Sequence, residues 1–146
     1  MIDAPGHLLA VDEAIRLRES RRISEDEFIR LAAEPDTVVL DARSAEMFER
    51  LHVRGAVNLS FPNFTAETLA AVIPTKTTRV LIYCNNNFLN SASAFPAKTI
   101  SVALNLSTFT NLHAYGYTNV YELGPLLNIN TTQLKLDGLE KKRKVR

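Results

Sequence analysis

The chain alternates between short apolar runs and stretches in which apolar residues recur at helical spacing. The apolar runs are rich in β-branched and aromatic residues and are bounded by turn-forming residues, as buried strands are. They predict strands at TVVLD (37–41), AVNLS (56–60), TRVLIYC (78–84) and TNVYEL (118–123). Because helical stretches separate these strands and each strand is nearly all apolar, the pattern predicts a parallel α/β sheet covered on both faces.

Helix-start signals precede several of the helical stretches. Ser24, Ser44 and Thr65 stand where an N-cap is expected, and Glu27 follows Ser24 at the capping-box position. The spacing of apolar residues predicts a further helix near the amino terminus, over AVDEAIRLRES (10–20). A last helix is expected before Gly116, which is a suitable stop. Its apolar face would carry Ile100, Ala103, Leu104 and Leu112.

Length and composition narrow the class of protein. A chain of 146 residues with 46% hydrophobic and 23% charged residues is typical of a single soluble domain, which we assign to residues 1–146. The net charge of +1 gives no reason to expect a nucleic-acid partner. The sequence contains neither a signal-peptide pattern nor a membrane-spanning apolar run, so we expect no membrane association and a cytoplasmic location. The basic ending EKKRKVR is interpreted as a peripheral, solvated tail.

Cys84 is the only cysteine and directly follows the most apolar strand. In an open parallel sheet, binding sites form beyond the carboxyl ends of the strands. A strand–loop–helix arrangement there surrounds the residue with backbone N–H groups, which lower a thiol pKa and favour the reactive thiolate. Asn85, Asn86 and Asn87 tolerate the positive φ that such a loop needs. Position alone leaves two alternatives open, since a lone cysteine is often buried in a core and an Asn cluster is often a polar turn.

Four segments occur in an order that resembles a single-domain rhodanese-like protein. They are TVVLDARSAEMF, HVRGAVNL, VLIYC and GYTNVYEL, and the resemblance covers about residues 24–123. It implies an α/β fold with a central five-stranded parallel sheet and helices on both faces. It also implies that Cys84 carries a transferable sulfur as a persulfide, taken from thiosulfate or a related donor and passed to a thiophilic acceptor.

The same resemblance implies the remaining site. The loop after the cysteine, formed by Asn85, Asn86, Asn87, Phe88, Leu89 and Asn90, would bind the anion. Asp41 and Arg43 match the family's Asp-x-Arg after its strand, where the arginine is expected to brace neighbouring loops, with a substrate contact as the alternative. The substrate would be a small sulfur-containing anion or thiol, with a protein as a possible sulfur acceptor. No metal or organic cofactor is required, and the scattered histidines do not suggest a metal site.

The chain also departs from the family pattern. CNNNFLN lacks the glycines and basic residues usual in active loops, and 32 positions separate Cys84 from Gly116, more than is typical. Since Pro96 is tolerated in a first helical turn, we expect the helix to begin near residues 94–96. Lys98 would then lie in that turn, where it could supply the missing positive charge or simply face solvent.

These departures keep a second function open. In place of a sulfurtransferase, the chain would be a catalytically inactive rhodanese-like module that binds a ligand or a protein. Phe88, Leu89 and Phe95 would form a lid or docking surface, or fold back onto the core. A phosphatase or arsenate reductase is disfavoured because Leu89, Asn90 and Ser91 stand where an oxyanion-binding arginine is needed.

Overall fold

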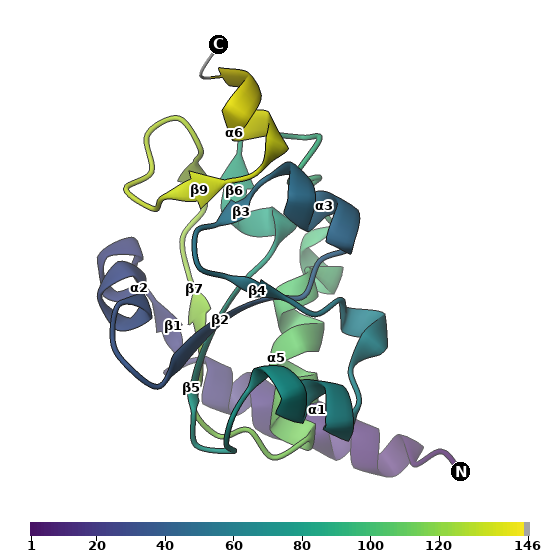
Figure 1. Ribbon diagram of the computed structural model, residues 1–146. Coiled ribbons are helices and arrows are strands. Elements are labelled where there is room, and N and C mark those ends of the chain that lie inside the picture. Colours follow the sequence, from purple (N-terminus) through teal and green to yellow (C-terminus); the bar gives the residue numbers. More distant parts are fainter. Residues whose placement is uncertain (145–146) are drawn as a thin grey trace.

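A computed structural model describes residues 1–144 and has a five-stranded parallel sheet at its centre (Figure 1). In spatial order the strands are β1 (Arg22–Ile23), β7 (Val120–Leu123), β5 (Arg79–Tyr83), β2 (Thr37–Asp41) and β4 (Val57–Asn58). Every neighbouring pair in this sheet is parallel. The predicted fold class is therefore confirmed. Strand β1 was not predicted from the sequence because two residues are too few to show a pattern.

Within the described residues 1–144, six helices accompany the sheet. They are α1 (Ala4–Arg18), α2 (Glu25–Ala32), α3 (Ala45–Arg50), α4 (Ala66–Val72), α5 (Leu104–Ala114) and α6 (Leu139–Lys144). Three short 3₁₀ turns are η1 (Phe61–Asn63), η2 (Asn85–Asn87) and η3 (Ile100–Val102). None of the helices within residues 1–144 is long and apolar enough to cross a bilayer.

The predicted helix starts depend on side-chain caps. The hydroxyls of Ser24, Ser44 and Thr65 each accept a hydrogen bond from a backbone N–H in the first turn of their helix. The capping-box role expected for Glu27 is not observed, because its carboxylate binds Arg30 on the same helix instead.

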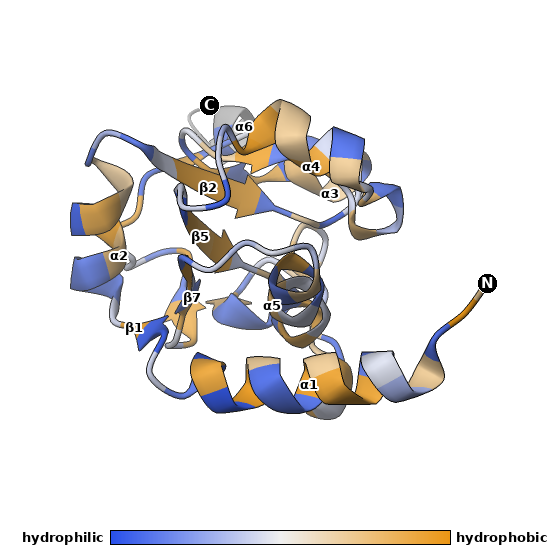
Figure 2. Cartoon of the chain, turned by 90° about the horizontal axis from the view of Figure 1, so that it is seen from below, coloured by the Kyte–Doolittle hydropathy of each residue, from blue (hydrophilic) through white to orange (hydrophobic). Residues whose placement is uncertain are grey.

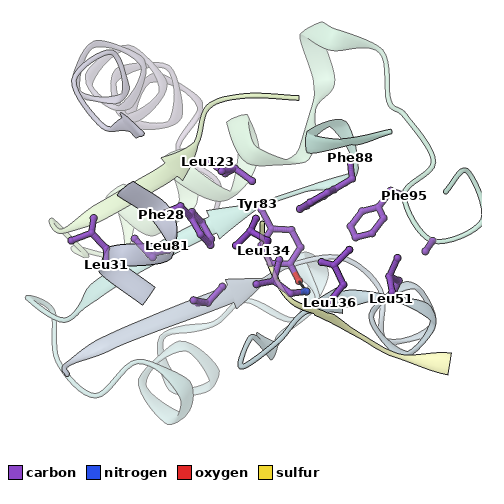
Figure 3. Close-up of a cluster of buried hydrophobic side chains, with 13 residues drawn as sticks. Phe28, Leu31, Leu51, Leu81, Tyr83, Phe88, Phe95, Leu123, Leu134 and Leu136 are labelled. Carbon is purple, nitrogen blue, oxygen red and sulfur yellow. Dashed lines mark hydrogen bonds between the residues drawn. The ribbon is translucent and has the colours of Figure 1, made fainter. Parts of the chain in front are cut away.

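Two apolar layers cover opposite faces of the sheet. In one layer, α2 and the carboxyl-terminal segment pack on the strands through a cluster that includes Phe28, Leu81, Tyr83 and Leu136 (Figure 3). In the other, α1, α4 and α5 pack on the strands through a second cluster. Figure 2 shows the largely apolar strands between these layers, with α1 crossing beneath α5 and packing against it.

The helix before Gly116 begins later than expected. The predicted start near residues 94–96 is wrong, since α5 begins at Leu104 and Pro96 lies in an irregular segment. Contacts from distant residues, described below, hold this segment in a non-helical path. Gly116 does follow the helix end, with a φ of 91° that suits glycine.

The carboxyl-terminal region contains structure that the sequence pattern did not indicate. Strand β8 (Leu127–Asn128) pairs with β6 (Phe88–Leu89), and β9 (Leu136–Asp137) pairs with β3 (His52–Val53). Helix α6 then takes up most of the basic ending that was interpreted as a solvated tail. The last part of that tail, residues 145–146, lies outside the described residues.

Candidate functional site

Cys84 lies at the carboxyl end of the central strand β5, next to the first turn of α5. Its side chain is buried, with 1% of its surface exposed. Backbone N–H groups of Asn86, Asn105 and Leu104 lie near enough to the sulfur to favour a negative charge on it. Two of these belong to the start of α5, where Ala103 at the N-cap provides no side-chain cap and leaves the terminal N–H groups free for another acceptor. The loop and the helix start therefore form a cradle of donors around one sulfur atom.

The thiol is nevertheless harder to ionise than a free cysteine. Burial raises the pKa of the Cys84 thiol, and the N–H groups of Asn86 and Asn105 oppose this only in part. The negative charge of Glu122 adds to the increase in pKa. The expectation that the cradle lowers the pKa is therefore wrong for this conformation, because desolvation of the thiolate outweighs the hydrogen bonds.

Asn87 and Asn86 hold the loop through their side chains. Asn87 Oδ1 accepts hydrogen bonds from the Cys84 backbone N–H, at 3.0 Å, and from Asn105 Nδ2, at 2.9 Å. Its Nδ2 donates to the carbonyls of Leu123 and Pro125. Asn86 forms two 2.8 Å hydrogen bonds with the backbone of Lys98, one as donor and one as acceptor. The asparagines thus fix the loop with amide hydrogen bonds.

Asn85, Asn86 and Asn87 do not adopt the positive φ that was expected of them. Residues 85–87 form η2, and none of the three has a positive φ. Asn90, at the far end of the loop, has a φ of 71°. Asn85 is buried with its Oδ1 free of any partner among residues 1–144, so it retains unused hydrogen-bonding capacity beside the cysteine.

The aromatic residues of the loop fold into the core. Phe88 and Phe95 are both buried, with ring centroids 4.6 Å apart, and lie in the cluster drawn in Figure 3. Leu89 is half exposed and remains at the surface. Of the two alternatives from the sequence, packing onto the core applies to the phenylalanines, and only Leu89 could contact a partner.

Lys98 does not lie in a helical turn. It precedes η3 in the irregular segment, and its side chain is exposed. The prediction that it occupies the first turn of α5 is wrong, because the hydrogen bonds to Asn86 hold its backbone away from that helix.

Asp41 and Arg43 form a buried ion pair on the other side of the sheet from Cys84. Arg43, 2% exposed, binds Asp41 at 2.8 Å and donates to the carbonyls of Ala94 and Leu51, each at 2.6 Å. Tyr83 donates from its hydroxyl to the same carboxylate. Arg43 therefore braces the irregular segment and the end of α3 by charge-assisted hydrogen bonds and has its donors occupied within the fold.

The sequence did not single out Glu122, Arg18 or Asn105, which also lie around the cysteine. Glu122 is a buried carboxylate in β7 that forms a two-point ion pair with Arg18 of α1. A charged residue inside the apolar run VYEL is a signal that could have identified it. Nothing in the sequence links it to Arg18, which is 104 positions away.

The surface cavities of the protein lie away from Cys84. Open cavities are found beside α3 and α6 and between α1 and α5, with Cys84 lining neither. Within residues 1–144, no three His, Cys, Asp or Glu side chains cluster closely enough to hold a metal ion. None of these cavities is lined by Cys84, whose sulfur is buried in the described structure.

Comparisons with known proteins bear on the family and the fold of the chain. Residues 24–124 match the family described as Rhodanese-like domain. A Rhodanese-like domain from Anabaena sp. is similar in structure, with a TM-score of 0.59 and 16% identity over 84% of this chain and 83% of that one. A protein from Bacillus halodurans gives a TM-score of 0.58 and 17% identity over 92% and 98% of the two chains.

A third similar structure is a thiosulfate sulfurtransferase from Pseudomonas aeruginosa. It gives a TM-score of 0.55 and 22% identity over 80% of this chain but only 19% of that much longer one. No curated protein matches the sequence. At these identities the structural likenesses show the fold, and the family rests on the match over residues 24–124.

Proposed function

The chain belongs to the Rhodanese-like domain family, and from that premise we propose that it moves sulfane sulfur through a persulfide on Cys84. It would act as a sulfurtransferase or as a persulfide carrier. The observation that supports this most directly is the position of the thiol at the end of β5, with the N–H groups of Asn86, Leu104 and Asn105 directed at its sulfur. Donors placed in this way stabilise negative charge on a sulfur atom.

The reaction has two covalent steps. In the first, the Cys84 thiolate attacks the outer sulfur of thiosulfate or a related donor. A sulfur–sulfur bond forms to the cysteine, the donor's own bond breaks, and sulfite leaves with the electron pair. In the second, a thiophile such as cyanide or a small thiol bonds to the outer sulfur, and the cysteine leaves as a thiolate. Neither step needs a metal or an organic cofactor.

The residues around Cys84 bear on each step. The backbone donors would hold the attacking thiolate, the persulfide and the regenerated thiolate in turn. The loop asparagines are neutral, so they provide hydrogen bonds without attracting an anion over a distance. Because the loop has no charge that selects for anions, we propose that the sulfur acceptor is a small thiol or a protein thiol as well as a small anion. We propose the cytoplasm as the compartment, since it keeps a free thiol reduced.

One observation favours a second function. The thiol is almost fully buried, and burial raises its pKa. These are properties of a structural cysteine, and they fit a catalytically inactive module that binds a ligand or a protein. The two functions differ in whether the sulfur can be reached and ionised when a donor is present.

Intact-mass spectrometry separates the two. The protein is incubated with thiosulfate, and separately with a low-molecular-weight persulfide, at several pH values up to about 9. A transferase gains the mass of one sulfur atom, and cyanide or a thiol removes it. Cys84→Ser is the matched control and gains nothing. If the wild-type chain gains no labile sulfur from either donor at any pH, the binding module is the correct function.

A further inference from the structure

Arg18 and Glu122 form a closed pair between the amino-terminal helix and the central sheet. Arg18 Nε and Nη2 donate to the two carboxylate oxygens of Glu122, at 2.6 and 2.7 Å. The carboxylate is buried in β7, and the side chain of Arg18 is only 18% exposed. A buried carboxylate must be paired to be tolerated, and the two-point geometry is the strongest pairing that a guanidinium offers.

This pair lies on the same face of the sheet as Cys84. Glu122 stands opposite Ile82 in the parallel register of β7 and β5, so these two side chains point to one face. Cys84 follows Ile82 by two residues with an extended backbone and therefore points to that face as well. The carboxylate is thus one strand across from the thiol and one step back along the sheet.

Helix α1 is held against this face by more than the ion pair. It packs across α5, the helix whose first turn provides two of the donors to Cys84 (Figure 2). Ala14 is fully buried between them, and Glu13 contacts His113 at 3.0 Å. Residues 4–18 lie outside the range 24–124 that matches the family, so this support comes from a part of the chain added to the family domain.

We propose that Arg18 is a positioning residue for Cys84, which acts by holding Glu122 in a neutral pair beside the thiol. A lone carboxylate at that place would repel the thiolate and any sulfur-containing anion that approaches it. The paired guanidinium offsets part of that charge and places a cation in the same electrostatic environment as the sulfur. The positive charge missing from CNNNFLN is in this way provided from α1.

Three other charged side chains, those of Arg21, Glu19 and Lys98, do not take this role. The buried polar side chains of the loop and of α5 are neutral, Asn85, Asn105 and Thr108 among them. Arg21 lies over the ring of Tyr121, which points to the opposite face of the sheet from Glu122. Glu19 next to Arg18 and Lys98 in the loop are both exposed, and their charges are screened by solvent.

The test is the pH dependence of Cys84 alkylation by iodoacetamide, which needs only a reachable thiolate. In Arg18→Met the carboxylate loses its partner, so the midpoint should rise by about one pKa unit and alkylation at neutral pH should slow about tenfold. Arg16→Met is the matched control, because Arg16 lies on the same helix with an 80% exposed side chain and should leave the profile unchanged.

Two further variants separate charge from folding. Glu122→Gln leaves Arg18 unopposed and should lower the midpoint, and the double variant Arg18→Met with Glu122→Gln should return it close to the wild-type value. A purely structural pair would not reverse the direction between the single variants. Unchanged profiles in both single variants, or a double variant that stays at the Arg18→Met value, would overturn the proposal.

The positioning role of Arg18 rests on the proposed function, because the thiolate it supports is the one that would take up sulfur. The positioning role and sulfur transfer can nevertheless fail separately. If the alkylation midpoints move as described but no donor loads sulfur on Cys84, the positioning role stands and sulfur transfer does not. If sulfur is loaded and the midpoints do not move, sulfur transfer stands and Arg18 has no part in it.

Discussion

The buried polar groups on the two faces of the central strand β5 differ in how fully their hydrogen bonds are satisfied. On one face, Asp41, Arg43 and Tyr83 form a buried network whose donors and acceptors are engaged within the fold. Around Cys84 on the other, the side-chain oxygens of Asn85 and Asn105 lack partners within the part of the chain that the structure describes. A satisfied network specifies one arrangement, and spare hydrogen-bonding capacity is what a site keeps for a ligand. The comparison supports the proposal that chemistry takes place on the second face, with the first face as scaffold.

Replacing Arg43 with Met should give the largest effect. It leaves the buried Asp41 carboxylate unpaired and the carbonyls of Leu51 and Ala94 without donors. The free energy of unfolding should fall by about 3–5 kcal/mol, measured by urea denaturation. Arg50→Met, which removes an exposed pair with Glu46, is the control and should change stability little. A loss at Arg43 no larger than at Arg50 would show that the first face is not a scaffold.

Replacing Asn87 with Leu should have an intermediate effect on stability and a clear one on the site. Four hydrogen bonds disappear, including the one to the Cys84 backbone N–H. We expect a loss of about 2 kcal/mol, since buried backbone groups are left unsatisfied. The rate of Cys84 alkylation should rise, because the loop that covers the thiol is no longer held. Asn111→Leu, which removes one hydrogen bond within α5, serves as the control. An alkylation rate equal to that of the wild-type protein would mean that Asn87 does not govern access.

The pH dependence of stability should show the smallest effect. Burial raises the pKa of Cys84 in the folded protein above that of an unfolded thiol, about 8.5. Below that pH both states hold the proton and stability is unaffected. Above it the unfolded chain loses the proton first, so the free energy of unfolding falls by up to about 1.4 kcal/mol per pH unit until the folded thiol also ionises. Urea denaturation between about pH 7 and 10 should show this slope in the wild-type chain and not in Cys84→Ser. Parallel curves would mean that the thiol is not desolvated.

The sequence was sufficient for the frame of the fold and for the position of the cysteine. Strands such as TVVLD and TRVLIYC show their burial in their own residues, and Ser44 and Thr65 cap helices through bonds to residues three positions away. Such local causes are visible in a sequence. The structure then places Cys84 directly after the central strand β5.

The parts that the sequence did not predict depend on distant contacts. The path of residues 90–103 depends on hydrogen bonds from Arg43 and Asn86, and the pairing of Arg18 with Glu122 joins residues 104 positions apart. The raised pKa of Cys84 has a similar origin, because desolvation is a property of the packed state and not of the residues beside the cysteine in the sequence.

Glu140 of α6 ties the carboxyl-terminal helix to the irregular segment that follows β6, and this link affects how the two open to solvent. Its carboxylate accepts hydrogen bonds from Ser91, at 2.9 Å, and from Ser93 in the segment next to the site (Figure 1). Strand pairing of β6 with β8 ties the same segment to residues 127–128. Residues 88–93 and residues 127–140 are therefore expected to exchange amide hydrogens as one cooperative unit, with a common opening rate.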